Sequence, residues 1–326
     1  MNNRHKNVTI TAFTLTVIFA ASLIAQSPLP ENSKKQPKFV AVSSDRNKIA
    51  YSTDGINWKE VTMPDEANWS NICYGNDKFV AVADSSDKAA YSSDGIKWKK
   101  TTLPDKANWQ SVCYGNDKFV AAAFGSDKAA YSTDGINWKT TIMPHEAEWF
   151  SLCYGNNKFV AIAGAGNKAA YSDDGIIWRT ATLPDEAEWR VVCYGNGKFV
   201  TVASKFNASN KTAYSYDGIK WKQATLPGKA NWQSVCYGDG KFVTLAYVSA
   251  NLAPGNKAAY SYDGINWFET AMPDEAVWSS VCYGNGKFVA VSSYSNKAAY
   301  SEDGVKWKAI TLPDEAIWES ICYGGN

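Results

Sequence analysis

The sequence predicts an all-β fold: a seven-bladed β-propeller with four antiparallel strands per blade. Three observations predict it. The motif Tyr-Ser-x-Asp-Gly-(Ile/Val)-x-Trp recurs seven times, the Lys-Phe pairs that open successive repeats are 40 to 46 residues apart, and each repeat holds four short strand-like segments. Four short strands in a repeat of this length are typical of a propeller blade. No segment has the periodicity of an amphipathic helix.

The repeat that starts at Lys78 illustrates the four strands. Residues 78–83 are short, apolar and β-branched, which favours a strand. Gly95 tolerates a positive φ and Asp94 can bond nearby backbone N–H groups, so residues 93–95 predict a tight hairpin turn. In chain order we expect strands at 78–83, 88–92, 96–103 (with Ile96 and Trp98 on one face and Pro104 ending the strand) and 109–114.

The two ends of the repeat region complement each other. It begins at Lys38 without a preceding Trp…Cys-Tyr-Gly strand, and it ends at residues 318–324 with such a strand and no Lys-Phe strand after it. We therefore expect the C-terminal strand to join the N-terminal blade and close the ring, giving about 28 strands and no open edge between the first and last blades.

The amino terminus has the features of an export signal. Residues 2–6 are basic and residues 8–25 are largely apolar, so we expect residues 1–25 to be a signal peptide or an uncleaved N-terminal anchor. Residues 26–37 are polar and contain prolines, which indicates a linker, and residues 38–326 form the propeller. The protein is then exported (secreted, periplasmic or at the cell surface), or anchored to a membrane by its N-terminus.

Composition and charge exclude several classes of function. A formal charge of +1 gives no field to attract nucleic acid, so we expect no nucleic-acid partner. We also expect a monomer. The seven cysteines fill one Cys-Tyr-Gly slot per repeat, which indicates small buried residues rather than disulfides. The chain has no CxxC or Cys/His spacing and no phosphate-binding glycine motif, so we expect no metal and no cofactor.

Ser-x-Asp-Gly-x-x-Trp resembles the Asp-box (BNR) signature, with one residue fewer between Asp and Gly. The chain is therefore similar to the sialidase/BNR-like propeller superfamily over residues 38–326. The resemblance implies that the box is a structural hairpin and not a catalytic element. Its positions are filled by Asp54, Asp94, Asp134, Asp174, Asp217, Asp263 and Asp303, and by Trp58, Trp98, Trp138, Trp178, Trp221, Trp267 and Trp307.

Known catalytic arrangements are missing. Sialidases of the superfamily hold a carboxylate with three arginines, but here Arg46, Arg179 and Arg190 stand at dispersed repeat positions. His145 is the only histidine after the leader, so a His-based nucleophilic mechanism is not expected. The adjacent acids of the Pro-Asp-Glu-Ala linkers are interpreted as solvated turns. We therefore expect no catalytic residues.

The best candidate surface lies where the repeat is broken. Two loops of neighbouring blades are enlarged, at 205–211 and 247–256, and the linker between those blades, 227–230, has lost both acids. We expect these departures to cluster on one face, because function is often carried by loops on a rigid scaffold. The opposite face, made by the Gly-Asn and Asp-Gly hairpins, is nearly invariant and is interpreted as structural. The candidate ligand-binding residues are Phe206, Asn207, Lys229, Tyr247, Asn251 and Leu252.

These observations favour a non-catalytic binding or interaction module for a protein or carbohydrate ligand. Two alternatives stay open. One is a divergent sialidase-superfamily glycoside hydrolase that uses carboxylates at the mouth of the ring. The other is an extracytoplasmic assembly factor.

Overall fold

The structure is a computed structural model that describes residues 38–45, 47–204, 209–247 and 255–324. The chain divides into two units, Met1–Lys34 and Lys35–Asn326, and all described residues belong to the second. They form 22 β-strands and no helix, as the all-β prediction requires. Within this described part, no helix could span a membrane.

Most strands have four to nine residues, and a few have 15 to 17 because they continue through a linker or loop. The first half of the chain contains β1 (Lys38–Ser43), β2 (Lys48–Ser52), β3 (Lys59–Thr62), β4 (Asn68–Gly75), β5 (Lys78–Asp84), β6 (Ser86–Ser92), β7 (Lys99–Gly115), β8 (Lys118–Ser132), β9 (Lys139–Gly155), β10 (Lys158–Ala163) and β11 (Lys168–Ser172). The second half contains β12 (Arg179–Thr182), β13 (Glu188–Gly195), β14 (Lys198–Ser204), β15 (Ser209–Ser215), β16 (Lys222–Ala230), β17 (Trp232–Gly238), β18 (Lys241–Ala246), β19 (Gly255–Ser261), β20 (Phe268–Gly284), β21 (Lys287–Ser301) and β22 (Lys308–Gly324).

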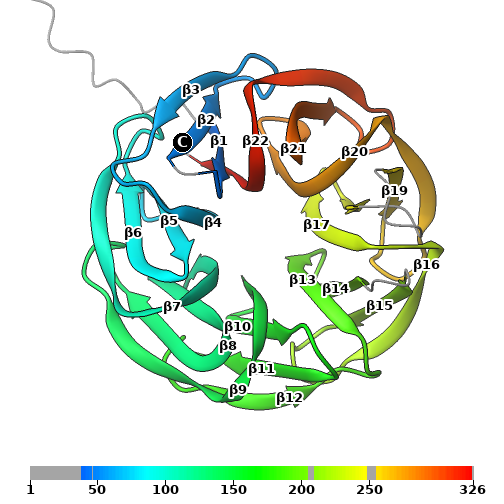
Figure 1. Ribbon diagram of the computed structural model, residues 1–326. Helices are drawn as coiled ribbons and strands as arrows, with labels where there is room; N and C mark the ends of the chain where they lie inside the picture. The colour runs from blue at the N-terminus through cyan, green and yellow to red at the C-terminus, as the bar shows by residue number, and fades with distance from the viewer. Residues whose placement is uncertain (1–37, 46, 205–208, 248–254, 325–326) are drawn as a thin grey trace, which may run out of the picture. The chain divides into compact units, whose positions relative to one another are not determined.

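All ladders between these strands are antiparallel, and within each sheet neighbouring strands follow chain order, except that β22 is followed by β1. They form three sheets of nine, nine and four strands. The last strand also pairs with the first: Lys38 lies opposite Gly324, and Val40 lies opposite Cys322. Figure 1 shows β1 beside the C-terminal part of β22, and β4, β13 and β17 turned toward the same centre.

The expected strand breaks at the linkers are wrong for several repeats. We expected Pro104 to end a strand, but β7 runs from Lys99 to Gly115 through it. Thr102 pairs with Lys88 and Ala107 pairs with Ser86, with a register shift between these pairs. Pro104 lies inside that irregularity, so its missing N–H breaks no ladder hydrogen bond. Merged strands of this kind explain why 22 strands form instead of about 28.

The Asp-Gly hairpin is wider than expected. Ile96 and Trp98 precede β7 and belong to the turn, not to the strand. Asp94 Oδ1 accepts hydrogen bonds from the Ser92 hydroxyl (3.0 Å), from Ile96 N–H (2.9 Å) and from Lys97 N–H (2.8 Å). The carboxylate therefore replaces ladder bonds through the turn. The same three bonds recur at Asp54, Asp134, Asp174, Asp217, Asp263 and Asp303.

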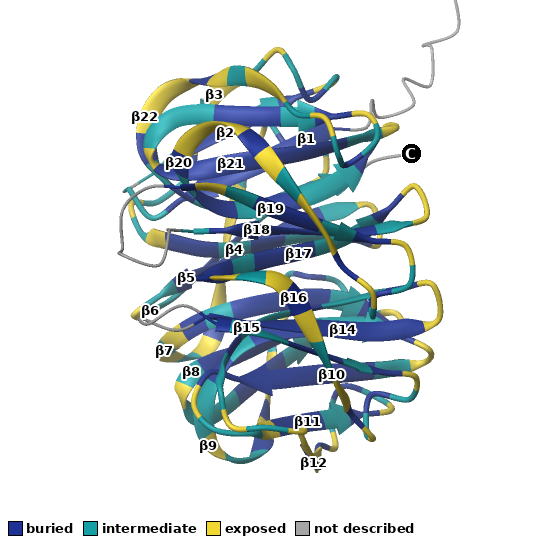
Figure 2. Cartoon of the chain, turned by 90° about the vertical axis from the view of Figure 1, so that its right-hand side faces the viewer, coloured by how far each residue is buried: buried dark blue, intermediate teal, exposed yellow. Residues whose placement is uncertain are grey.

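The core consists of seven apolar clusters between neighbouring ladders. Each contains one Trp from a Trp…Cys-Tyr-Gly strand, one Phe from a Lys-Phe strand and one Asp-box Trp. One cluster joins Phe39 and Trp318 to Val289, so it links the first and last repeats. Figure 2 shows buried residues along the inner strands, and exposed residues in the turns and along outer strands such as β3 and β16.

The Cys-Tyr-Gly segments lock adjacent repeats together. A Cβ on Gly155 would lie 2.0 Å from Cγ of Tyr194 in the next repeat, so only glycine fits beneath that ring. Gly324 and Tyr74 make the same contact between the last and first repeats. All seven cysteines are free thiols, as expected from their spacing, but only Cys113 is buried and the other six are half-buried.

Candidate functional site

Each Trp…Cys-Tyr-Gly strand contains a β-bulge directly after its buried tryptophan. On β13, for example, Trp189 pairs with Ala203 and Val191 with Val202, so Arg190 is the extra residue. A bulge re-aims one side chain and often lies next to a functional site. We call the seven extra residues the bulge ring: Ser70, Gln110, Phe150, Arg190, Gln233, Ser279 and Glu319.

The repeats differ at this position of the strand and at the residue before the tryptophan. The residue before it is always Trp and the residue after it is Ser in five repeats, whereas the bulge position holds Ser, Gln, Phe, Arg or Glu. The seven bulge-ring residues were not predicted from the sequence, because their differences between repeats lie within a strand and not in a loop. The signal was the variable residue between Trp and Ser.

The residue after the bulge fixes the strand to its neighbour. The Ser111 hydroxyl accepts a hydrogen bond from Leu152 N–H (2.9 Å), and the Ser234 hydroxyl accepts one from Val281 N–H (2.9 Å). Asn71 Oδ1 does the same for Val112 N–H (3.2 Å). These bonds satisfy backbone donors that the bulge leaves outside the ladder. The variable side chains are thus held on a fixed frame.

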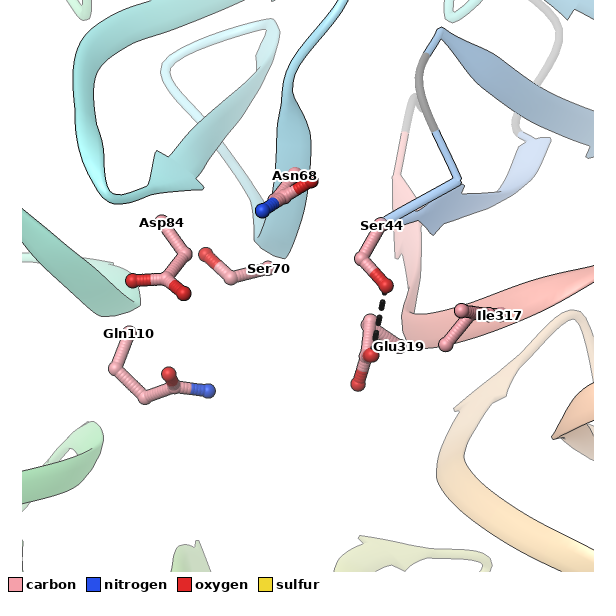
Figure 3. A pocket seen from close by; sticks show the side chains of 7 residues that line it. All are labelled: Ser44, Asn68, Ser70, Asp84, Gln110, Ile317 and Glu319. Carbon is pink, nitrogen blue, oxygen red and sulfur yellow. Dashed lines mark hydrogen bonds between the residues drawn. The ribbon is translucent and has the colours of Figure 1, made fainter.

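All seven bulge-ring residues line one pocket of about 120 Å³, which we call the ring pocket. A second pocket of about 320 Å³ shares Ser70, Gln110 and Glu319 with it. Figure 3 shows this second pocket, which we call the acidic pocket because Asp84 and Glu319 lie on opposite sides of it. Its other lining residues are Ser44, Asn68 and Ile317.

Arg190 is the cation of the ring pocket. Its guanidinium carbon lies 4.2 Å from the centroid of the Phe150 ring, a cation–π contact. The nearest carboxylate oxygen, Glu188 Oε2, is 3.9 Å from Nη2, and Nε has no acceptor among the described residues. Burial lowers the pKa of Arg190, opposed by the charges of Glu188 and Glu148. The guanidinium is positioned by a ring face rather than by hydrogen bonds.

Glu319 is the anion that the two pockets share. Burial raises its pKa, the hydroxyl of Ser44 lowers it by donating a hydrogen bond to Oε1 (3.0 Å), and the charge of Asp84 raises it further. Figure 3 shows the Ser44 bond as the dashed line. No lysine, arginine or histidine in the described ranges lies within salt-bridge distance of Glu319 or Asp84.

Tyr247 also lines the ring pocket. Burial raises the pKa of its hydroxyl to about 12, with further contributions from Tyr294 and Glu319, while Arg190 opposes the shift. Its backbone N–H donates to Asn231 C=O (2.8 Å), which fixes the start of the enlarged loop beside the pocket. Tyr247 is the one sequence-predicted ligand residue that the structure places with the bulge ring.

The other predicted ligand residues lie elsewhere or outside the described ranges. Lys229 is exposed and lines a separate pocket of about 200 Å³ with Glu186, Ser209 and Lys211. The odd linker therefore borders the described end of the first enlarged loop. Phe206, Asn207, Asn251 and Leu252 fall outside the residues that the structure describes.

Arg179 and His145 both lie away from the ring pocket. Arg179 is exposed and bonds Asp173 (3.0 Å), away from the ring pocket. His145 is not simply solvated: it is half-buried and stacks on Trp149, with ring centroids 5.2 Å apart. Arg46 falls outside the described residues.

The face made by the Asp-Gly and Gly-Asn hairpins is less uniform among the repeats than predicted from the sequence. Tyr216 and Tyr262 replace smaller residues of the Asp-box turn and are 52% and 55% exposed. Tyr262 contacts Phe268, itself 49% exposed, with ring centroids 6.4 Å apart. Lysines stand over both tyrosine rings, at 5.3 Å for Lys198 and 5.5 Å for Lys241. These aromatics form a second departure from the repeat, on the face interpreted as structural.

Comparison with known proteins gives structural likeness only. No protein-family model and no curated protein sequence matches the chain. Inactive virginiamycin B lyase from Staphylococcus aureus with quinupristin is similar, with a TM-score of 0.68 and 12% identity over 88% of this chain and 96% of that one. YCF48 bound to D1 peptide gives a TM-score of 0.59 and 10% identity over 85% and 95% of the two chains.

AztD from Citrobacter koseri is a further structural neighbour, with a TM-score of 0.55 and 11% identity over 90% of this chain and 88% of that one. At such low identities these likenesses establish the fold and nothing more. The described strands are all antiparallel and their solved neighbours are propellers. The chain therefore has an all-β, β-propeller fold.

Proposed function

We propose that the protein is a non-catalytic binding module whose ligand, a protein or a glycan, enters the ring pocket. One observation carries this proposal: the seven bulge-ring residues, which differ in size and charge between repeats, all line a single pocket. Packing alone explains the invariant Trp and Gly positions, but it does not explain why residues as different as Arg, Glu and Phe stand at one repeat position that faces a single cavity.

The finer architecture belongs to the same proposal. Seven four-stranded blades in a closed ring would bring all seven bulges to one centre. The pairing of β22 with β1, and the packing of Tyr74 on Gly324, support ring closure. The Asp-box hydrogen bonds support placing the chain in the sialidase/BNR-like superfamily, with the box as a turn and not as a site.

The enlarged loops extend the proposed ligand surface. Tyr247 lines the ring pocket and begins the loop that carries Asn251 and Leu252. A ligand larger than the pocket would then reach this loop. Phe206, Asn207 and Lys229 would form a second contact area on the neighbouring repeat.

Export remains part of the proposal. Residues 1–25 would act as a signal peptide or anchor, and residues 26–37 as a linker to the propeller. Amino-terminal sequencing of the protein recovered from the medium, the periplasm and the membrane fraction tests this. A mature chain that starts near residue 26 supports cleavage, and full-length protein in the membrane fraction supports an anchor.

A glycoside hydrolase is the second candidate, because Asp84 and Glu319 face one pocket. Burial raises the pKa of Glu319, which suits a proton donor, and Asp84 across the pocket would serve as base or nucleophile. A screen of chromogenic glycosides separates the two functions. Turnover that Glu319→Gln abolishes supports the hydrolase, and capture without turnover supports the binding module.

The main experiment is a glycan-array and pull-down screen with the purified protein. We expect specific capture of a ligand, at least ~10-fold weaker in Arg190→Gln or Glu319→Gln, because each substitution removes one half-buried charge that the pocket presents. Lys222→Gln on the exposed outer strand β16 is the matched control and should retain capture. Equal capture by all variants would contradict the ring pocket as the site.

A further inference from the structure

The joined pockets carry opposite charges at separate places. Arg190 lines the ring pocket, Asp84 lines the acidic pocket, and Glu319 lines both. Arg190 does not pair with either acid: its nearest carboxylate is Glu188, at 3.9 Å. Tyr247 lines the ring pocket together with Arg190 and Glu319.

The positive pole is preorganised. The guanidinium stacks over Phe150, whose ring packs edge-on against Phe124 with centroids 5.0 Å apart. Gly164 leaves the space for Phe150, because a Cβ there would lie 2.3 Å from that ring. A planar guanidinium held by its face presents its N–H groups edgewise, which is the geometry that binds a carboxylate.

The negative pole has two carboxylates, and no residue that the structure describes supplies a counter-charge to them. Asp84 and Glu319 face the acidic pocket, and among the described residues they accept hydrogen bonds from Ser85 N–H (2.7 Å) and the Ser44 hydroxyl (3.0 Å). Within the described part of the chain no cation reaches either acid. Partly buried carboxylates without a cation are costly, and a ligand ammonium group would offset that cost.

We propose that the ligand is dipolar: it places a carboxylate at Arg190 and a cationic amine between Asp84 and Glu319. An uncharged ligand would desolvate both poles without compensating either, and a ligand of one charge would leave the other pole unpaired. The class includes amino acids and peptide ends whose carboxylate and amine are separated by several bonds. This inference rests on the ring pocket being the binding site.

Calorimetric titration of the purified protein tests the ligand class with four small probes: 6-aminohexanoate, lysine, hexanoate and hexylammonium. At pH 8 we expect 6-aminohexanoate and lysine to bind at least ~10-fold more tightly than either singly charged probe, since two charged hydrogen-bonded contacts replace one. Equal binding of hexanoate and 6-aminohexanoate, or no binding of any probe, would overturn the proposal.

Two variants assign the poles. In Arg190→Gln, 6-aminohexanoate should bind no better than hexylammonium, while hexylammonium is unaffected. In Glu319→Gln, 6-aminohexanoate should bind no better than hexanoate. The exposed Lys222→Gln and Glu302→Gln are the matched controls and should bind like the parent. A parallel loss for all probes in either variant, at an unchanged melting temperature, would contradict the assignment of poles.

The probe series also separates this inference from the proposed function. If a variant fails to fold, the preference of the parent protein among the four probes still decides the ligand class. If the arrays capture a neutral glycan or a protein through the ring pocket while all four probes fail to bind, the dipolar ligand is wrong and the binding module stands. If the probes bind as expected but the array captures nothing, the dipolar site stands and the macromolecular ligand is wrong.

Discussion

Single residues in this chain have clear and different physical roles at repeated positions. The Asp-box carboxylates are hydrogen-bond acceptors for a turn, the cysteines are small groups that are buried or half-buried, and the residue after the inner tryptophan varies in size and charge. Burial alone would raise the pKa of Asp263, but hydrogen bonds from Asn266 N–H, Ile265 N–H and the Asn266 side chain outweigh it and lower the pKa to about 2.

Acid should therefore remove the contribution of Asp263 to stability. A carboxyl whose folded pKa is depressed stabilises the fold above its unfolded value of 3.8, and that stability is lost as the pH falls toward about 2. Asp263→Asn should thus be less stable than the parent near neutral pH, and the difference should shrink below pH 3.8. Urea unfolding of both proteins at a series of pH values measures it; a difference that grows on acidification contradicts the account.

The cysteines should be unreactive in the folded protein. Burial raises the pKa of Cys153 to about 12, so almost no thiolate exists near neutral pH. We expect a chromogenic disulfide reagent at pH 8 to label the native chain slowly and all seven thiols rapidly in denaturant. Fast native labelling, mapped by mass spectrometry to a Cys-Tyr-Gly segment, would show that these thiols are not buried as described.

At the scale of elements, the sequence predicted strand type and order better than strand ends. The Lys-Phe and Tyr-Ser strands were predicted because β-branched and apolar residues alternate with turn signals. Pro104 was misread because a proline inside a bulge needs no ladder bond, and bulges depend on register with a partner strand. The bulge ring was not predicted for the same reason. The extra residue at Arg190 is recognised only from the pairing of β13 with β14, and simple alternation along the strand does not predict it.

The contact between Cys-Tyr-Gly segments gives a prediction at this scale. Gly155→Ala would drive a methyl group into the Tyr194 ring and should destabilise the protein by about 1–3 kcal/mol. Gly228→Ala is the control, because its Cβ would meet only the flexible Lys257 ammonium, at 3.1 Å. Chemical unfolding of both variants measures the effect. Equal stability of the two would show that the Tyr194 ring yields without cost.

For the whole molecule, the repeat predicted the fold because seven equivalent copies must pack alike on their neighbours. It could not predict the site, because a site depends on which residues converge at one centre. Tyr247 was identified through its loop, whereas Arg190 and Glu319 were identified only once the ring pocket was described. Both occupy the same position of the repeat, which holds Ser, Gln or Phe in the other five repeats. The variation at this position became informative only when the structure showed that these residues line one pocket.

The most direct test of the central claim is to fill the ring pocket and measure ligand capture. Gln233→Trp adds a large side chain at a bulge-ring position without changing charge, and Gln223→Trp on the exposed part of β16 is the matched control. With melting temperatures checked in parallel, we predict that the Gln233 variant loses capture by at least ~10-fold while the Gln223 variant binds like the parent. Undiminished capture by a folded Gln233→Trp protein would contradict the assignment of the ring pocket as the ligand site.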